Sequence, residues 1–579
     1  MTANSAIRRR TPTASTAAWP AQMHPVLRRV YAARGICSSE QVEHRLAHMA
    51  PPASLGGMTV ACELLADAMR HEKRIVVVGD FDCDGATGTA VAVRGLRLLG
   101  ARQVGYRVPN RFLHGYGLSR ELVETLVEPS PDLIITVDNG IASIAGVRAA
   151  RERGIDVLVT DHHLPGPELP AANAIVNPNL ADDAFASKAL AGVGVIFCVL
   201  VALRAHLREI DWFAERELPE PDLSVLLDLV ALGTVADLVP LDFNNRVLVQ
   251  AGLRRIRSGQ ACAGINALLR SAGRATATLV PSDLGFAAAP RINAAGRLED
   301  MALGIECLLT DDPATAQGHA ERLSAINAER RELQTSMVEQ AEAAVSRWIA
   351  AQGRSALPLG LTLFEDDWHA GVVGLVASKL KDRLHRPVVA CAPALEGGNE
   401  VRCSARSIRG IHVRDILAEV DVRCPGLIVR FGGHAMAAGL TLDRSDVPRF
   451  AEVFDSVVRS RAAAELFEPV VLTDGELDAG DFSLELATEL RYAGPWGQGF
   501  SEPLFDNDFE LHSWRLVGGK HWRMTLRPSG ADHLVEAMHF NVDPGAIPPQ
   551  QFRAAYQLDV NEWNGRESLQ LILRHVEAA

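Results

Sequence analysis

Short runs of apolar residues, separated by longer amphipathic stretches, dominate the first third of the chain. Residues 75–78, 133–137 and 157–159 are such runs, and residues 104–108 form a weaker one. A short apolar run bounded by polar residues or glycine predicts a strand that is buried on both faces. Helix-like stretches such as 90–99 lie between the runs. This alternation of strand and helix predicts a parallel, doubly wound sheet.

Three further changes of pattern follow along the chain. A polar stretch, residues 314–351, is almost free of helix breakers and has only a weak apolar stripe, which is typical of a helix bridging two domains. A second strand-and-helix unit begins near residue 359, and short alternating runs after residue 468 predict a small β-barrel. We therefore expect a multidomain α/β protein with a disordered N-terminal tail (1–22), a parallel-sheet domain (23–311), a connecting helix (312–354), a smaller α/β domain (355–462) and a C-terminal barrel (463–579).

Composition narrows the class of protein. A chain of 579 residues is too long for one core, so several domains are expected. The net charge of −13 excludes a global basic surface, so any nucleic acid would have to meet a local basic groove. The nine cysteines show no CxxC pair, which is typical of a reducing cytoplasm and argues against a zinc ribbon. No segment has the length and purity of a membrane span, and Arg8–Arg10 are not followed by the apolar stretch of a secretory signal.

The first buried strand runs directly into a cluster of carboxylates. Asp80, Asp82 and Asp84 follow it at alternate positions, and we expect Gly85 and Gly88 to let the backbone turn tightly into the next helix. Carboxylates placed this close repel one another unless cations hold them. The cluster also lies at the carboxyl edge of the predicted sheet, where open α/β sheets bind ligands. We therefore expect a metal site.

Other interpretations of this cluster fit less well. An EF-hand loop needs a glutamate at its twelfth position, which is Val91 here, and a helix rather than a strand before it. A P-loop needs Gly-Lys-Ser/Thr, and Gly85 is followed by Ala86 and Thr87. A turn whose aspartates only cap a helix remains the structural alternative.

Two more strands end in ligand-type side chains. Asp138 follows the strand at 133–137, and Asp161, His162 and His163 follow the strand at 157–159. Because the carboxyl ends of parallel strands meet at one edge, these side chains should converge with the first cluster. Aspartate oxygens together with imidazole nitrogens suit Mn²⁺, and Mg²⁺ with a looser preference.

Several later residues are open to two interpretations. Asp237, alone in an apolar run, is either a helix cap or a further metal ligand, and we favour the ligand. Arg111 is either a surface charge or a phosphate contact, and Gly433 with His434 forms either a phosphate-binding turn or a plain tight turn. Arg291 and Asn293 lie in what we expect to be a glycine-bearing loop that contacts phosphate. Aromatic residues of the barrel are either stacking faces for bases or core: Trp496, Phe500, Phe505, Trp514, Trp522 and Trp563.

Taken together, these motifs resemble those of the DHH phosphoesterases. The matching segments are Asp80–Gly85, Val137–Gly140, Asp161–His163 and Gly233–Leu241, and Gly432–Gly439 resembles the partner domain called DHHA1. From about residue 50 to the end the chain is similar to bacterial members that degrade single-stranded DNA and carry a C-terminal OB-fold. The resemblance implies a 5′→3′ exonuclease for single-stranded DNA in recombination and repair, dependent on Mn²⁺ or Mg²⁺ with two ions bound. It also implies a single-strand binding protein and a repair helicase as partners, and we expect a monomer.

The resemblance assigns roles residue by residue. It implies that Asp138 bridges two ions and takes part in catalysis, that His163 orients water or contacts the scissile phosphate, and that Asp161 supports them. The DNA end and its phosphate would be held by Arg111, Ser404, Arg406, Gly433 and His434. The metal ligands it implies are Asp82, Asp84, Asp138, His162 and Asp237, with Asp80 beside them.

Three rival functions remain open, the weakest of which is a metal-binding structural protein with no substrate. A phosphodiesterase for small nucleotides would use the same scaffold, although the barrel argues against it. A non-catalytic scaffold that only binds single-stranded DNA is another rival, and the intact ligand set argues against that.

Overall fold

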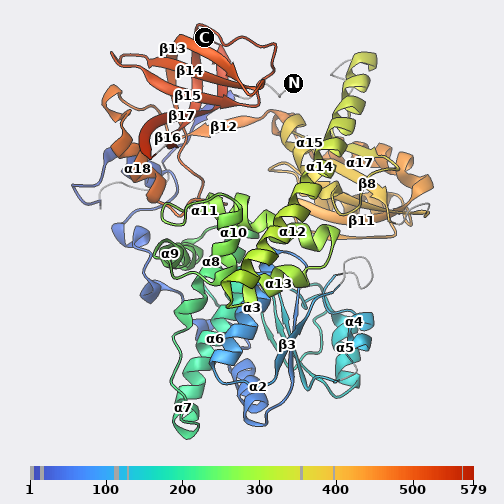
Figure 1. Ribbon diagram of the computed structural model, residues 1–579. Helices are drawn as coiled ribbons and strands as arrows, with labels where there is room; N and C mark the ends of the chain where they lie inside the picture. Colours follow the sequence, from blue (N-terminus) through green and yellow to red (C-terminus); the bar gives the residue numbers. More distant parts are fainter. Residues whose placement is uncertain are drawn as a thin grey trace.

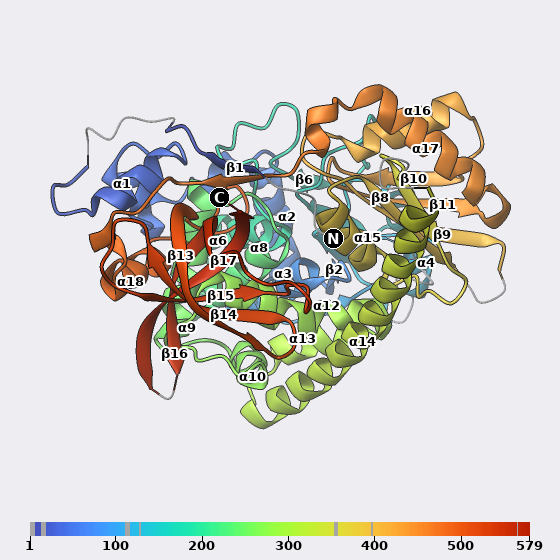
Figure 2. The same cartoon turned by 90° about the horizontal axis from the view of Figure 1, so that it is seen from above.

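The computed structural model describes residues 6–12, 19–109, 116–126, 129–352, 357–394, 398–563 and 565–578 (Figure 1). In Figure 1 the barrel and the second α/β domain lie above the first domain, and the turned view in Figure 2 shows them on different sides of the molecule. Among the residues so described, no helix combines the length and the apolar character that crossing a membrane requires.

The first domain is built on one parallel sheet, as the alternation of strands and helices predicted. Its strand order is β3-β2-β4-β5-β6, and every pairing is parallel. The strands are β2 (Ile75–Gly79), β3 (Val104–Arg107), β4 (Leu133–Val137), β5 (Asp156–Thr160) and β6 (Ala174–Val176).

Helices cover both faces of this sheet because both faces of its strands are apolar. Along β2, Ile75 and Val77 pack into the core formed with α2, α3 and α6, whereas Val76 and Val78 pack against α4 and α5. These helices are α2 (Met58–Arg70), α3 (Cys83–Leu98), α6 (Gly192–Glu209), α4 (Arg120–Thr125) and α5 (Ile144–Glu152). The remaining α-helices of this half are α1 (Pro25–Ala32), α7 (Trp212–Glu215), α8 (Leu227–Ala236), α9 (Phe243–Arg257), α10 (Ala263–Ser271), α11 (Pro281–Asp283), α12 (Ala289–Leu298) and α13 (Ala302–Leu309).

A single helix of 40 residues, α14 (Pro313–Gln352), joins the two α/β domains, which confirms the predicted connecting helix. Its first half buries Ala316, Ala320 and Leu323 in the core of the first domain. Its second half buries Met337 and Ala341 against the second domain. The weak apolar stripe in the sequence reflects this change of partner, because no single face of the helix is buried along its whole length.

The second α/β domain holds a mixed sheet of order β10-β11-β9-β8-β7, in which only β7 and β8 pair in parallel. Its core is separate from that of the first domain. The elements are β7 (Leu361–Phe364), α15 (Val373–Leu384), β8 (Val388–Pro393), β9 (Glu400–Arg406), α16 (Val413–Arg423), β10 (Arg430–Gly433), β11 (Ala437–Asp443) and α17 (Val447–Arg461).

The C-terminal region forms the predicted closed barrel, of order β13-β14-β15-β17-β16. Phe505, Phe509 and Tyr556 fill its interior, while Trp496 and Phe500 stack on each other at its base (ring centroids 4.9 Å apart). Trp522 is also buried, so most of the aromatics that we weighed as stacking faces are core; Trp514 is exposed, and the side chain of Trp563 lies outside the described residues. The elements are β12 (Val470–Thr473), α18 (Leu484–Tyr492), β13 (Phe505–Val517), β14 (His521–Pro528), β15 (Val535–Phe540), β16 (Gln551–Trp563) and β17 (Arg566–Ala578).

The N-terminal segment corrects the prediction of a disordered tail over 1–22. Strand β1 (Ala6–Arg9) pairs in parallel with β12, and the Arg9 guanidinium donates to the buried Asp506 carboxylate (2.9 and 3.1 Å). Trp19 is buried and stacks on Tyr31. Composition indicates only whether a segment can bury enough of its own apolar surface. Residues 6–9 are held instead by partners more than 460 residues away in sequence.

Candidate metal centre

The predicted carboxylates do lie at the carboxyl edge of the first sheet, but the glycines beside them act differently from the prediction. Helix α3 begins at Cys83, so Gly85 and Gly88 lie inside the helix rather than in a turn before it. A Cβ atom at Gly85 would lie 2.6 Å from the Asp80 backbone, and one at Gly88 would lie 2.5 Å from Val137 Cγ1. The glycines therefore allow α3 to pack close against the ends of β2 and β4.

This close packing fixes the first two ligands of the cluster. Asp82 caps α3, and its Oδ1 accepts a hydrogen bond from the Gly85 N–H (3.0 Å). Asp84, two residues later, is buried and accepts hydrogen bonds from the N–H groups of Gly192 (2.6 Å) and Val193 (2.9 Å) at the start of α6. The two carboxylates are thus held in place by backbone donors of two helix N-termini.

Asp138 sits at the centre of the site in an uncommon backbone conformation. Its φ of +62° lies in the left-handed region, which aspartate and asparagine tolerate better than most residues. Asn139, which the sequence analysis missed, stabilises this turn because its Nδ2 donates to the carbonyls of both Val78 and Val137 (2.9 Å each). The only signal in the sequence was an asparagine directly after a strand-end aspartate.

The histidine pair after β5 is held by Asp161. Its carboxylate accepts hydrogen bonds from the backbone N–H groups of Ile141, His162 and His163, and from Nδ1 of the His163 ring (2.7 Å). Burial disfavours the charged carboxylate, but the hydrogen bond and charge of His163 outweigh it, so the pKa of Asp161 lies below its ordinary value. Asp161 is therefore placed to orient the two histidines.

Three groups of side chains converge closely enough to hold metal ions. In each group the ligand atoms lie within 4.8 Å of one another. Asp138 belongs to two of the groups and His162 also to two. The groups are Asp80, Asp82 and Asp138; Asp84, His162 and Asp237; and Asp138, His162 and His163. The ligands inferred from the sequence are thereby brought together in space, with Asp138 where a bridging carboxylate would lie.

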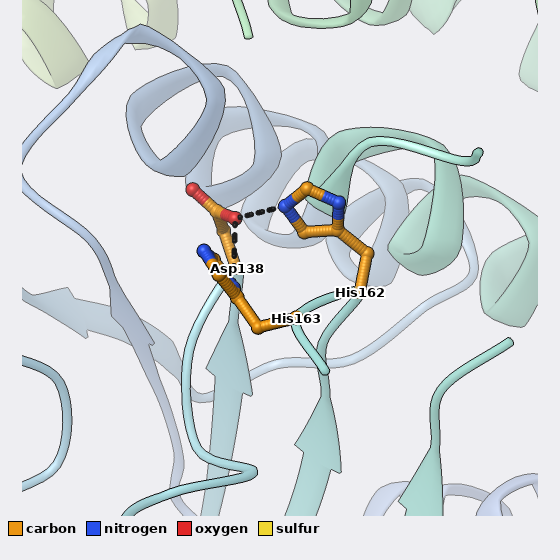
Figure 3. Close-up of side chains that lie close together, drawn as sticks. All are labelled: Asp138, His162 and His163. Atoms are coloured by element: carbon orange, nitrogen blue, oxygen red, sulfur yellow. Dashed lines mark ion pairs between the residues drawn. The ribbon is translucent and has the colours of Figure 1, made fainter. Parts of the chain in front are cut away.

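Two unsatisfied atoms point to the same place. His162 Nε2 lies 3.1 Å from Asp138 Oδ1 and 3.5 Å from Asp237 Oδ2, and His163 Nδ1 lies 3.9 Å from the same Asp138 oxygen (Figure 3). Asp138 Oδ1 and His162 Nε2 are both buried without a hydrogen-bond partner. Burial, followed by the charge of His163, lowers the pKa of His162 to about 3, so its ring is neutral near pH 7. A neutral imidazole nitrogen and a carboxyl oxygen that lie this close together, each without a hydrogen-bond partner, are suitable ligands for a divalent cation.

The crowded carboxylates have strongly perturbed acidities. Burial, and then the charges of Asp84 and Asp82, raises the pKa of Asp138 well above its ordinary value. The same causes raise the pKa of Asp237 well above its ordinary value, and burial with the charge of Asp82 raises the pKa of Asp84 to about 7. Mutual repulsion of this size is relieved either by protons or by cations.

These shifts predict that a metal ion stabilises the fold more at high pH. Asp84, Asp138 and Asp237 bind protons more tightly in the folded chain than in the unfolded chain, so the metal-free fold loses stability as pH rises from about 4 to about 7. Ions replace those protons, so the rise in Tm caused by a fixed Mn²⁺ concentration should be several degrees larger at about pH 7.5 than at about pH 5.5. Thermal unfolding with Mn²⁺ and with chelator measures this, and a rise independent of pH would contradict it.

Two residues predicted to contact phosphate, Arg291 and Asn293, lie in a helix rather than in a loop. The loop expected over 290–297 is instead part of helix α12. Pro290 lies in the first turn of the helix, where proline is tolerated, and Gly296 allows the helix to pack closely against the Phe81 backbone. Arg291 donates to Ser324 Oγ (3.0 Å) and to the Ala287 carbonyl (2.5 Å), so it joins helices.

Asn293 and Arg111 are the other first-domain residues that were predicted to contact phosphate. Asn293 lies beside the cluster, but its Oδ1 accepts from the Cys83 N–H (2.7 Å) and holds the start of α3. Arg111 lies outside the described residues.

The second α/β domain reaches the cluster through His434. The His434 ring lies 5.4 Å from the His163 ring, at an interplanar angle of 30°. Gly433 precedes it as the last residue of β10, with a φ of +145°, and a Cβ there would lie 2.5 Å from the Ala437 carbonyl oxygen. On β9, Arg406 Nη1 donates to Ser404 Oγ (2.9 Å), so these two predicted residues form one polar pair. A histidine of each domain therefore borders the same site.

Known proteins share each part of this architecture. Models of three families match: the DHH family N-terminal domain over residues 74–234, the DHHA1 domain over 356–460 and the RecJ OB domain over 473–575. Each matched segment falls inside one of the domains predicted from the sequence.

Whole-chain similarity points the same way. The single-stranded-DNA-specific exonuclease RecJ of Dickeya dadantii is 51% identical over 98% of both chains. The crystal structure of RecJ from Thermus thermophilus in complex with Mn²⁺ covers 96% of this chain and 76% of its own, with 31% identity and a TM-score of 0.78. The structure of the same protein in complex with Mg²⁺ covers 96% and 75%, with 29% identity and a TM-score of 0.72. With this identity over nearly its whole length, and with the same three domains around one aspartate–histidine cluster, the chain belongs to the RecJ family of single-stranded-DNA-specific exonucleases.

Proposed function

We propose that this chain is a metal-dependent exonuclease that hydrolyses single-stranded DNA from its 5′ end. The observation that carries the proposal is the sharing of Asp138 between two ligand groups, with His434 of the second domain facing the site. Two divalent ions that share a carboxylate, Mn²⁺ or Mg²⁺ here, activate water and neutralise charge on a phosphoryl group when they are bound. The aspartate-rich donor set, with one neutral histidine, suits these ions.

The side chains of the site would have the following roles. Asp80 and Asp82 would hold one ion, Asp84, His162 and Asp237 the other, and Asp138 both. His163 lies beside the shared carboxylate. Burial lowers the pKa of His163, but the hydrogen bond and charge of Asp161 raise it by more, so the net pKa lies above its ordinary value. A protonated His163 would contact the scissile phosphate and contribute positive charge there. Asp161 would hold His163 in that orientation.

The second domain would bind the strand end. His434 faces the cluster, and the Ser404–Arg406 pair lies on a strand of the same sheet as Gly433. These groups would hold the phosphates, and Arg111 would assist them. Phosphate contacts of this kind carry no sequence information, so cleavage should be largely independent of sequence and sensitive to salt. The 5′→3′ polarity would follow if the two domains leave only a free 5′ end access to the ions.

The barrel would bind the part of the single-stranded DNA that lies farther from the scissile phosphate. Trp514 is the exposed aromatic on β13, 39% exposed, and Leu516 two residues later on the same strand is equally exposed. We expect Trp514→Ala to weaken binding of long single strands about tenfold, because one stacked base contributes about 1–3 kcal/mol. Hydrolysis of a short oligonucleotide that cannot reach the barrel should be unchanged.

Filter binding and rates on strands of two lengths test this prediction. Leu516→Ala is the matched control, since it removes an equally exposed apolar side chain that is not aromatic, and it should change neither quantity. Equal losses by Trp514→Ala on long and short strands would contradict the division of labour.

One experiment tests the proposed function as a whole. Single-stranded DNA labelled at its 3′ end is incubated with Mn²⁺, with Mg²⁺ and with chelator. Progressive shortening from the 5′ side that chelator abolishes is the expected result. Tight binding without shortening would indicate a DNA-binding scaffold, and cleavage of dinucleotides alone would indicate a small-nucleotide phosphodiesterase; either result would overturn the proposal.

Further expectations accompany this proposal. We propose a cytoplasmic monomer, recruited to DNA by a single-strand binding protein and a repair helicase. All nine cysteines are free thiols, which suits a reducing compartment. The resemblance to the family supports the two partners.

A further inference from the structure

The two histidines after β5 lie just beyond the last backbone pairing of β5 with β6. In that pairing Thr160 lies opposite Val176, and the Asp161 N–H donates to the Val176 carbonyl (3.2 Å). Strand β6 ends at Val176, so the backbone groups of His162 and His163 lie outside the ladder. Backbone donors and acceptors near a protein interior need partners, because leaving them unpaired costs free energy. Other groups must therefore hold this segment.

Two asparagine side chains take over where the strand ends. Asn177 Nδ2 donates to the His163 carbonyl (2.9 Å), and Asn179 Nδ2 donates to the His162 carbonyl (2.5 Å). Asn177 Oδ1 accepts from the Asn179 N–H (2.8 Å), so the two asparagines are also joined to each other. That bond settles the orientation of the Asn177 amide, because only its nitrogen can donate to a carbonyl. We call Asn177 and Asn179 the asparagine clamp.

Asp161 holds the other backbone groups of the same two residues. Its Oδ1 accepts from the N–H groups of His162 (2.7 Å) and His163 (3.1 Å). Both N–H groups are thus bonded to Asp161, and both carbonyls are bonded to the asparagine clamp. Asn177 is fully buried, so its hydrogen bonds are shielded from water and strengthened. A backbone held at its donors and its acceptors fixes the points from which the two imidazole rings project.

Asn173 has the same chemistry at the other end of β6. Its Oδ1 accepts from the Val157 N–H and from Arg151 Nη1 (2.8 Å each), and its Nδ2 donates to Asp156 Oδ1 (2.8 Å). Asp156 is the first residue of β5, so Asn173 supports the amino end of that strand. Its partners belong to none of the three ligand groups. Asn173 is therefore an internal control for an asparagine that supports only the sheet.

We propose that the asparagine clamp positions the histidine pair for metal binding and catalysis. Asn179 sets the place of His162, the neutral ring of the proposed ion site. Asn177 sets the place of His163, the ring proposed to contact the scissile phosphate. The proposal rests on the proposed exonuclease function for the roles of the two rings. Both asparagines are positioning residues, since each acts through the backbone of a histidine.

The first test measures Mn²⁺ binding to the DNA-free protein, from the electron paramagnetic resonance signal of the free ion. Asn179→Ala should weaken binding about tenfold, because groups that orient a metal ligand typically contribute a factor of about 10 to 100. In cleavage of 3′-labelled single-stranded DNA, the Mn²⁺ concentration for half-maximal rate should rise by a similar factor. The rate at saturating Mn²⁺ should stay within about threefold of the parent, because the ion restores its own site.

Asn177→Ala should have a second effect. It removes the support of His163 and also the bond that holds Asn179. Mn²⁺ binding should therefore weaken about tenfold, and the rate at saturating Mn²⁺ should also fall about tenfold or more. This split between metal affinity and maximal rate separates the two positions. Asn173→Ala should leave both quantities unchanged, even if it lowers the Tm.

The outcomes separate the clamp from the proposed function. Unchanged Mn²⁺ binding in Asn179→Ala would overturn the clamp, as would an equal loss in Asn173→Ala, which would assign the effect to general weakening of the sheet. Thermal unfolding in chelator shows which variants fold. If Asn177→Ala, at a fully buried position, does not fold, Asn179→Ala at its half-buried position decides the test. If the unmodified protein binds Mn²⁺ but does not shorten DNA, the exonuclease function fails, and the binding comparison still decides the clamp.

Discussion

Replacing Asp138 by asparagine is expected to abolish cleavage of single-stranded DNA, with a loss of about three orders of magnitude or more. Asp138 groups with Asp80 and Asp82, and its Oδ1 lies 3.1 Å from His162 Nε2 of the second proposed ligand set, so its loss should disturb both proposed ions at once. A metal ion contributes several kcal/mol of charge stabilisation in the transition state, and each factor of ten corresponds to about 1.4 kcal/mol. Degradation of 3′-labelled DNA under single-turnover conditions measures the loss.

Asparagine tests the role of Asp138 better than alanine does, because the backbone at this position is in the left-handed region. Alanine would have to adopt the φ of +62° with little local support, whereas asparagine tolerates it. The change also removes a buried carboxylate whose pKa is raised by burial and by the charges of Asp84 and Asp82. We therefore expect the metal-free variant to melt at or above the Tm of the metal-free parent near neutral pH.

An exposed carboxylate elsewhere provides the control for this variant. Asp182→Asn removes the same charge from the surface of the first domain and should change neither rate nor Tm. Retention of more than about a tenth of the activity by Asp138→Asn, or loss of its cooperative melting transition, would refute the assignment.

The second large effect is expected at His163. His163→Gln should lower the turnover rate by about 10²- to 10⁴-fold, the range for removing a side chain that handles charge or protons in the transition state. Burial lowers the pKa of His163, but the hydrogen bond and charge of Asp161 raise it above its ordinary value. If the protonated ring acts, activity must fall as pH rises through this elevated pKa.

Asp161→Asn makes the role of His163 visible in the pH profile. The variant keeps an acceptor oxygen but removes the charge, so the pKa of His163 should fall and the alkaline limb of the rate profile should move to lower pH. His71, an exposed histidine paired with Asp67, is the matched control, and His71→Gln should leave both the rate and the profile unchanged. An alkaline limb that stays in place in Asp161→Asn would show that His163 does not act in its protonated form.

The sequence alone determined the framework of the site. Apolar runs of four or five residues bounded by glycine or polar residues favour buried strands, and strands that alternate with helices favour parallel pairing, so the carboxyl edge and its side chains could be predicted from local pattern. Asp82, Asp84, Asp138 and His162 were placed in this way. The long helix and the barrel were equally visible, because each depends on a period or a breaker pattern within one segment.

The tertiary structure decided everything that depends on contact between distant segments. It brought Asp237 and His434 to the cluster, turned Asp161 toward its two histidines, and made α12 a helix where a glycine-bearing loop was predicted. It also ordered Ala6–Arg9 on β12. Local pattern reports propensity and burial within about a dozen residues. Which side chains converge, and which remain exposed beside the site, is set by close packing between elements far apart in sequence.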